Sequence, residues 1–408
     1  MFSRIFTALT LAISLHESVA LGASSDLRRQ INIENWQQAP YNRYSFQHVS
    51  EMIATAVIAK QTKSTRTIET KKDPSILSMT STSGTPMIEH LEHGKVDGFM
   101  AIKNGKIIFE EYRNNMKPYT RHLNMSTSKS ITGTLAWIAV QEGLLDPEKL
   151  ITDYIPELKN SAWQGAKVRH VMDMTSAVKY EEGYENPNSE LKIHEQVIGW
   201  GPRVSQNLPK DQNAFIKQLK IDDRLKFHGN HYEYRSIETD VLAWIVEAST
   251  GQRFHSYLSQ KIWSKIGAEY DALITVDNSG IAMADGGMNM TLKDHARFGL
   301  FVLEGGLEDS FYNDLNTSSR ELISSYKKSS EYEVFSEITG SKNMYYRNQW
   351  RVLDPEKEIY LSIGVYGQFL YIDRSQNFVG VIFSSTARAK EVEIVKTNIE
   401  FLQMLSGW

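Results

Sequence analysis

A serine and a lysine three residues apart are the first residues in this sequence whose types and spacing could perform covalent chemistry. Ser126-Thr127-Ser128-Lys129 stands where a helix is predicted to begin, and that helix continues to about residue 142. Three residues are nearly one helical turn, so the Ser126 hydroxyl and the Lys129 amine would share one side of the helix. A neutral amine there could take the hydroxyl proton, which requires that burial or a neighbouring cation lower the pKa of Lys129. The pattern is common by chance, and a helix-capping Ser126 beside a solvated Lys129 would also account for it.

Two backbone donors for a developing oxyanion are predicted as well. The Ser126 N–H lies among the unpaired N–H groups of a helix N-terminus, where it could face the oxyanion. Near the C-terminus, Val365-Tyr366-Gly367-Gln368 lies in a strand-like stretch, and a glycine there often marks close approach of the backbone to a ligand. We therefore predict the Gln368 N–H as the second donor, with Tyr366 and Gly367 binding substrate. An ordinary strand glycine is the alternative.

A third pattern, Tyr234-Arg235-Ser236, directly precedes a helix predicted over 237–249. A tyrosine phenol can share the proton network of a nucleophile and deliver a proton to a leaving group. Ser236 is also a natural helix N-cap, and Tyr234 could be an ordinary half-buried aromatic residue.

The elements that must hold these patterns follow from the spacing of apolar and turn residues. Apolar runs on either side of Asn104-Gly105 predict a hairpin over about 99–109. Aromatic and β-branched runs predict strands over 345–352, 359–365, 369–372 and 378–383, and apolar residues at helical spacing predict a closing helix over 392–405. The intervening 148–275 is predicted to be mostly helices and long loops. We expect an α+β fold, an antiparallel sheet flanked by helices with an inserted all-helical lobe, and a site in the cleft between them.

In their order along the chain, these patterns resemble the β-lactamase and penicillin-binding serine hydrolase superfamily, whose S-x-x-K is a known signature. The first motif is Ser126-Thr127-Ser128-Lys129, the second is Tyr234-Arg235-Ser236, and the third is Val365-Tyr366-Gly367. Residues 168–176 and 286–298 are similar to connecting segments of class C β-lactamase-related proteins, and the resemblance covers about residues 98–407. Within that superfamily, Tyr234-Arg235-Ser236 with 237–240, Asn348-Gln349-Trp350 and Gly364–Gln368 resemble the 6-aminohexanoate-dimer hydrolases and related carboxylesterases. Ile338-Thr339-Gly340 could also be the third motif, in place of Val365-Tyr366-Gly367. We reject it as that motif because it lies in a polar, loop-like stretch.

The resemblance implies two-step acyl transfer without a metal or cofactor. Ser126 would be the nucleophile, Lys129 the general base and Tyr234 the proton donor to the leaving group, helped by Ser236. Tyr184 would lie on a loop that borders the substrate, unless it is simply an exposed loop tyrosine.

One departure from the family pattern bears on the substrate. Lys or His normally opens the third motif and meets a substrate carboxylate, whereas this chain has Val365. Losing such a charge-assisted contact costs about 1.5–3 kcal/mol. We therefore favour a hydrolase of small esters or short amides. The alternatives are a DD-peptidase or β-lactamase, and a catalytically silent member that binds peptide or cell-wall ligands.

Composition excludes several other classes of function. The chain of 408 residues has a net charge of −4, which gives no electrostatic footprint for nucleic acid, and it has no cysteine for thiolate or disulfide chemistry. Nucleotide-binding, zinc-hydrolase and G-x-S-x-G motifs do not occur in the sequence.

The N-terminus predicts export. Arg4 precedes an apolar run over 5–15 and small residues follow at 18–22, as in a signal peptide cleaved near residues 20–23 and leaving a periplasmic or secreted protein. No other stretch approaches 18 apolar residues, so no membrane span is expected in the mature chain. We expect a signal at 1–22, an N-terminal extension at 23–86 with little core of its own, and a catalytic domain at 87–408. Its α/β part would be 87–147 and 276–408, and its helical lobe 148–275.

Overall fold

The computed structural model describes residues 27–61, 64–225 and 227–408 of the chain. The predicted signal at 1–22 lies outside these residues. Among the described residues, no helix is both long and apolar enough to cross a bilayer.

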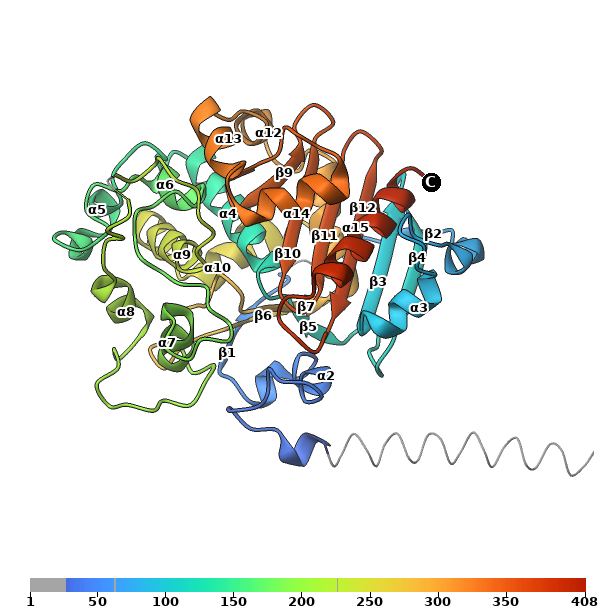
Figure 1. The fold of residues 1–408 in the computed structure, drawn as a ribbon, viewed down its shortest axis with the longest axis horizontal. Coiled ribbons are helices and arrows are strands. Elements are labelled where there is room, and N and C mark those ends of the chain that lie inside the picture. Colours follow the sequence, from blue (N-terminus) through green and yellow to red (C-terminus); the bar gives the residue numbers. More distant parts are fainter. Residues whose placement is uncertain (1–26, 62–63, 226) are drawn as a thin grey trace, which may run out of the picture.

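An eight-stranded sheet lies at the centre of the fold, with strand order β2-β4-β3-β12-β11-β10-β9-β8 (Figure 1). Neighbouring strands are antiparallel, except that β2 and β4 are parallel. The predicted hairpin is β3–β4, and Met100 of β3 pairs with Val381 of β12, which confirms that strands far apart in sequence form one sheet. The strands are β2 (Glu69–Thr70), β3 (Val96–Lys103), β4 (Lys106–Tyr112), β8 (Tyr345–Arg347), β9 (Trp350–Asp354), β10 (Ile359–Gly364), β11 (Gln368–Asp373) and β12 (Phe378–Ser384).

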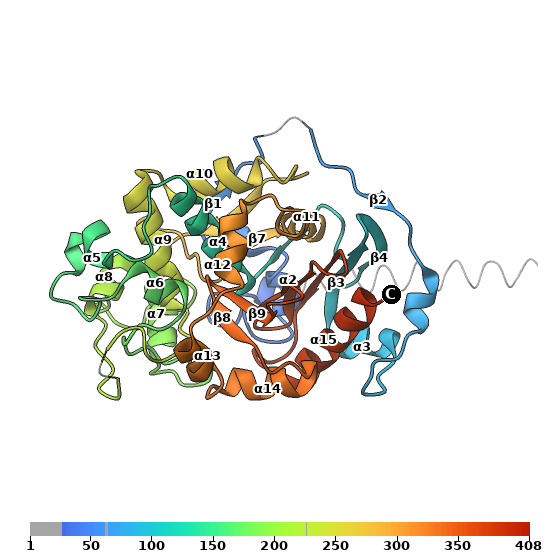
Figure 2. The same cartoon turned by 90° about the horizontal axis from the view of Figure 1, so that it is seen from above.

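Helices cover both faces of this sheet. Figure 2 shows α11 (Leu292–Leu303) and α15 (Val392–Ser406) on opposite sides of it. Successive side chains of a strand point to opposite faces. On β12, a Cβ at Gly380 would meet Leu402 of α15, whereas Val379 packs against Gly299 of α11. The first described helix of the catalytic part, α3 (Met87–His93), contacts α15 and β3.

The helical lobe lies beside the sheet, and α4 (Thr127–Gln141) connects the two, because it contacts both β10 and α9. The lobe contains α5 (Ile151–Tyr154), α6 (Val168–Met172), α7 (Glu190–Val197), α8 (Gln212–Gln218), α9 (Ile237–Thr250) and α10 (Phe254–Leu258). As its sequence predicts, α9 ends at Gly251, which has the left-handed φ of 67°. The α+β class with an inserted helical lobe is therefore confirmed.

A second sheet, which the sequence did not predict, has the order β1-β6-β7-β5. Its strands are β1 (Thr55–Ile58), β5 (Arg121–Leu123), β6 (Ala272–Thr275) and β7 (Met288–Thr291). Because β1 comes from the N-terminal extension and pairs with β6, the described part of the extension is built into the catalytic part.

The extension also contributes a small core beside the central sheet. Trp36 and Phe46, on either side of α2 (Asn42–Ser45), are buried and cluster with Met125, Trp200 and the ring of Tyr366. The extension was expected to have little core of its own, and in the structure it shares this core with the turn before α4.

Three helices, α12 (Asp309–Leu315), α13 (Arg320–Tyr326) and α14 (Ser330–Thr339), precede β8. The polarity of the stretch around Ile338-Thr339-Gly340 suggested a loop, and this prediction is wrong. The stretch is the end of α14, with Gly340 in the left-handed conformation at φ 68°.

Candidate active site

Ser126 lies at the N-terminus of α4, in the turn that leaves β5. The preceding residue, Met125, has a φ of 47°, which is uncommon for a residue with a side chain. Ser126 is the N-cap residue of α4, yet its hydroxyl makes no capping hydrogen bond. The simple capping role is therefore not what holds this serine, and its Oγ is free to act in the cavity that it lines.

Lys129 is buried beneath Ser126 and is not a solvated helix side chain. Its Nζ donates to Ser126 Oγ at 2.9 Å and to the Asp285 carbonyl at 2.7 Å, and it lies 3.8 Å from Asp285 Oδ2. The helical spacing of the motif thus brings the amine and hydroxyl into direct contact, as expected from the sequence.

The charge environment of Lys129 differs from the expected one. Burial by itself lowers the pKa of Lys129, but the fields of Tyr234, Asp285, Glu182 and Asp240 outweigh burial and raise it above its ordinary value. Lys129 is therefore a cation in the resting site. The sequence suggested a lowered pKa because the carboxylates come from segments remote from α4.

Tyr234 completes the group around Ser126. Its ring centroid lies 5.3 Å from Lys129 Nζ and 5.0 Å from the Arg351 guanidinium carbon, and it lines the same cavity as Ser126. Both cations lie over the electron-rich ring, an arrangement that holds its orientation.

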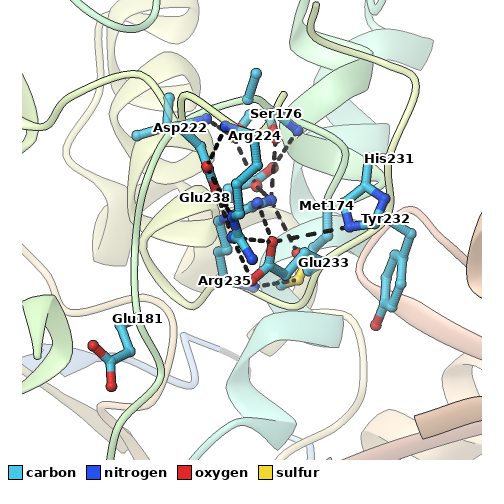
Figure 3. A network of polar contacts seen from close by, with 12 residues as sticks. Met174, Ser176, Glu181, Asp222, Arg224, His231, Tyr232, Glu233, Arg235 and Glu238 are labelled. Carbon is cyan, nitrogen blue, oxygen red and sulfur yellow. Dashed lines mark hydrogen bonds and ion pairs between the residues drawn. The ribbon is translucent and has the colours of Figure 1, made fainter. Parts of the chain in front are cut away.

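Arg235 anchors the segment that carries Tyr234. Its side chain is fully buried and donates to the Glu233 carboxylate at 2.6 Å and to the Ser176 carbonyl at 3.1 Å (Figure 3). Glu238, in the first turn of α9, accepts a hydrogen bond from the Ser176 hydroxyl at 2.8 Å, and burial raises the pKa of Glu238 to about 8. No role for this arginine was predicted, because Ser176 comes from a distant segment.

Ser236 and Tyr184 meet through a carboxylate that sequence reasoning missed. Glu182 accepts hydrogen bonds from the Ser236 backbone N–H and from the Tyr184 hydroxyl, the latter at 3.1 Å. Tyr184 lines the cavity, and Lys390 Nζ lies 5.1 Å from its ring centroid. Glu182 thus joins the loop of Tyr184 to the start of α9.

The third motif forms the tight turn between β10 and β11. Tyr366 and Gly367 have left-handed φ values of 63° and 88°, and Gly364 approaches Ser126 so closely that an added Cβ would lie 2.9 Å from the Ser126 nitrogen. Val365 and Gly367 line the cavity. The turn therefore brings this backbone against the N-terminus of α4, as expected for an oxyanion site.

Gln368, whose backbone N–H is predicted as the second oxyanion donor, is the first residue of β11. It is fully buried opposite Gly364 in the β10–β11 ladder, outside the cavity lining, and its side chain donates to the Ser384 carbonyl at 2.6 Å. Tyr366 turns toward the extension, with its ring 5.1 Å from that of Phe46. The turn at Tyr366 and Gly367 falls between the strands predicted over 359–365 and 369–372.

The cavity in front of Ser126 has a volume of about 340 Å³. Most of its outer wall is apolar and comes from α14, α15 and the segment before α15, including Val334, Phe335, Val392 and Val395. Two described lining residues carry positive charge. Arg351 is buried and paired with Glu331, whereas Lys390 is exposed. The described residues contain no cluster of three or more His, Asp or Glu that could hold a metal ion.

Comparison with known proteins places the chain in a family. The profile of the beta-lactamase family matches residues 88–402. The 6-aminohexanoate-dimer hydrolase of Paenarthrobacter ureafaciens is 33% identical over 362 residues, which are 86% of this chain and 88% of that protein.

Solved structures with the same fold are also found. A Bacillus anthracis protein assigned as a 6-aminohexanoate-dimer hydrolase superimposes with a TM-score of 0.81 and 26% identity, over 93% of this chain and 97% of that one. A penicillin-binding protein homologue from Pyrococcus abyssi, 16% identical, shares the fold with a TM-score of 0.59, over 78% of this chain and 76% of that one.

Proposed function

We propose that this chain, which belongs to the beta-lactamase family and is a serine hydrolase, cleaves small esters or short amides through an acyl-enzyme on Ser126. The observation that carries the proposal is the 2.9 Å hydrogen bond between Lys129 Nζ and Ser126 Oγ at the wall of the cavity. The named substrate of the Paenarthrobacter relative makes a 6-aminohexanoate dimer the first amide to test.

In the first step, Ser126 Oγ bonds to the substrate carbonyl carbon as its proton passes to the neutral form of Lys129. The tetrahedral oxyanion is held by the Ser126 N–H and by the Val365 N–H, which we assign in place of Gln368 because Val365 lines the cavity beside Gly364. Collapse of this intermediate breaks the bond to the leaving group, whose alkoxide or amine takes a proton from Tyr234, and Tyr234 regains a proton from Lys129. Water then hydrolyses the acyl-enzyme by the same route.

The charges at the third motif support a substrate without a carboxylate beside the bond that is cleaved, whereas the carboxylate of a 6-aminohexanoate dimer lies at the far end of its chain. Val365 carries no charge, Arg351 is already paired with Glu331, and Lys390 is exposed to solvent. A β-lactam or a D-Ala–D-Ala peptide would therefore lack the buried cation that its carboxylate requires. This disfavours the DD-peptidase and β-lactamase alternatives.

Labelling and turnover together test the proposal. A fluorophosphonate should label the parent protein and leave Ser126→Ala unlabelled, and that variant should lose turnover of nitrophenyl esters and of the aminohexanoate dimer while its thermal unfolding stays unchanged. Ser128→Ala is a matched control, because Ser128 is buried one residue before Lys129 and does not line the cavity. Turnover that persists in purified Ser126→Ala would contradict the assignment. A parent protein that is not labelled would favour a silent ligand-binding member.

We also propose that residues 1–22 direct export and are removed, on the strength of the charge and apolar pattern there. N-terminal sequencing of the mature protein from the periplasm or medium should begin near residues 20–23. A mature chain that retains Met1 in the cytoplasm would contradict this.

A further inference from the structure

Two carboxyl groups lie next to Lys129 that the mechanism above does not use. Asp285 is buried, with Oδ2 3.8 Å from Lys129 Nζ. Asp240, on α9, is fully buried, and its Oδ1 accepts the backbone N–H groups of Ala284 at 2.8 Å and Asp285 at 3.3 Å. The Asp240 carboxyl group therefore lies directly against the backbone of Asp285.

The hydrogen bonding of the Asp240 and Asp285 carboxyl groups is incomplete, because one oxygen of each is unpaired within the described part of the chain. Asp240 Oδ2 and Asp285 Oδ1 are both buried, and neither has a hydrogen-bond partner among the residues that the structure describes. Two ionised carboxylates this close repel each other, whereas one carboxylic acid supplies a donor for the other group. A single proton would thus remove the repulsion and give the pair the donor that it lacks.

The neighbouring charges decide which group keeps the negative charge. Asp285 faces Lys129, while Asp240 lies behind it against backbone N–H groups. Burial and then the charge of Asp285 raise the pKa of Asp240 well above its ordinary value. Burial also raises the pKa of Asp285, but Lys129 and a hydrogen bond from Ser236 oppose that increase.

Other titratable groups also surround Lys129, Asp240 and Asp285. His194 is neutral near neutral pH, because burial lowers its pKa to about 4. Glu182 adds negative charge near Lys129. The remaining groups whose fields reach Lys129 or the pair are Tyr180, Tyr184, Tyr234 and Glu195.

We propose that Asp240 and Asp285 share one proton, carried by Asp240, so that the pair presents a single negative charge to Lys129 and sets its protonation state. This inference rests on the proposed role of Lys129 as the base for Ser126. Asp285 is then a positioning residue that acts through Lys129. Its charge favours the ammonium form, so the base form of Lys129 appears only at higher pH than it would beside a neutral side chain.

The pH dependence of kcat/KM tests whether Asp240 and Asp285 together carry one negative charge or two. Asp285→Asn removes the negative charge, so the acidic limb of the profile should move to lower pH by about one unit or more. Asp240→Asn replaces the acid by an amide of the same shape that also donates, so the limb should stay in place. If both groups are ionised in the parent, the two variants will shift the limb alike, which would overturn the proposal.

Infrared difference spectroscopy gives a readout that does not depend on turnover. The parent minus Asp240→Asn spectrum at neutral pH should contain the carbonyl band of a protonated carboxylic acid. Asp294→Asn is the control, because Asp294 is equally buried but paired with Arg297 at 2.7 Å, and its difference spectrum should contain only carboxylate bands. Absence of an acid band for Asp240 refutes the shared proton even if Asp285→Asn does not fold. Failure of the proposed function is separate, since it would appear as turnover in Ser126→Ala.

Discussion

The close approach of Gly364 to the turn before α4 makes Gly364→Ala a sharp test of the oxyanion site. A Cβ at this position would lie 2.8 Å from the Asn124 carbonyl oxygen, 2.9 Å from Met125 Cβ and 2.9 Å from the Ser126 nitrogen. Ordinary contacts of carbon are about 3.5–4.0 Å, so each of the three is short by more than half an ångström. The end of β10 must therefore move away from Ser126.

That movement separates the two proposed donors, the Ser126 and Val365 N–H groups. Loss of one oxyanion donor lowers kcat by about 10²–10³-fold, or about 2.7–4 kcal/mol of transition-state stabilisation. We expect kcat for a nitrophenyl ester to fall within this range in Gly364→Ala, with a smaller change in KM. Active-site titration with a fluorophosphonate should supply the concentration of competent enzyme.

Gly380→Ala is the matched control on the same sheet. Its Cβ would lie 2.2 Å from Leu402 on the face away from α11, which overpacks the core and costs about 1–3 kcal/mol of stability. Its melting temperature should fall, while kcat per titrated site should not change. If Gly364→Ala keeps the parent kcat, or if Gly380→Ala loses as much, the second donor does not lie at Val365.

Three further predictions concern the proton donor, the buried network and the substrate. Tyr234→Phe keeps the ring over which Lys129 and Arg351 lie but loses the hydroxyl, so kcat should fall by about 10²–10⁴-fold with unchanged thermal stability, and a parent-like kcat would exclude Tyr234 as the proton donor. Burial raises the pKa of Glu238 from 4.5 to about 8, so its contribution to stability is complete below the lower value and is lost as pH rises through the higher one. Glu238→Gln should therefore flatten the decrease in unfolding free energy over this interval in urea titrations, and an equally steep decrease would show that another group is responsible. Of two nitrophenyl esters of equal length, the neutral one should have a kcat/KM about 10-fold or more above the one with a terminal carboxylate, and the reverse order would reveal a cation that the cavity provides.

The parts of the site that depend on local spacing could be predicted from the sequence. Ser126 and Lys129 meet because they are one turn apart on a helix, and Gly251 ends α9 because it adopts a left-handed φ. The central sheet followed from a hairpin and late strands whose residue types are typical of strands. Each of these inferences needs only residues that are close in sequence.

The parts that depend on distant residues could not be predicted. The raised pKa of Lys129 comes from Tyr234 and from carboxylates on three other segments, and β1 pairs with a strand more than two hundred residues away. Helix α14 has one buried apolar residue, Phe335, so its sequence lacks the apolar stripe that would identify it. Tyr366, a residue with a side chain, adopts a φ of 63°, and its ring contacts Phe46 of the extension, which lies more than three hundred residues away in the sequence.

The charges of the site connect its chemistry to its substrate. In the penicillin-binding pattern a cation of the third motif is available to the substrate. Here Val365 removes that cation, Arg351 is neutralised by Glu331, and Lys129 is neutralised by Asp285 beneath Ser126. The buried positive charges of Arg351 and Lys129 are therefore balanced within the protein itself, and a substrate carboxylate at the third motif would lack a partner. The same balance explains why Asp240 holds a proton. A second negative charge behind Asp285 would exceed the charge of Lys129 and would have no cation of its own.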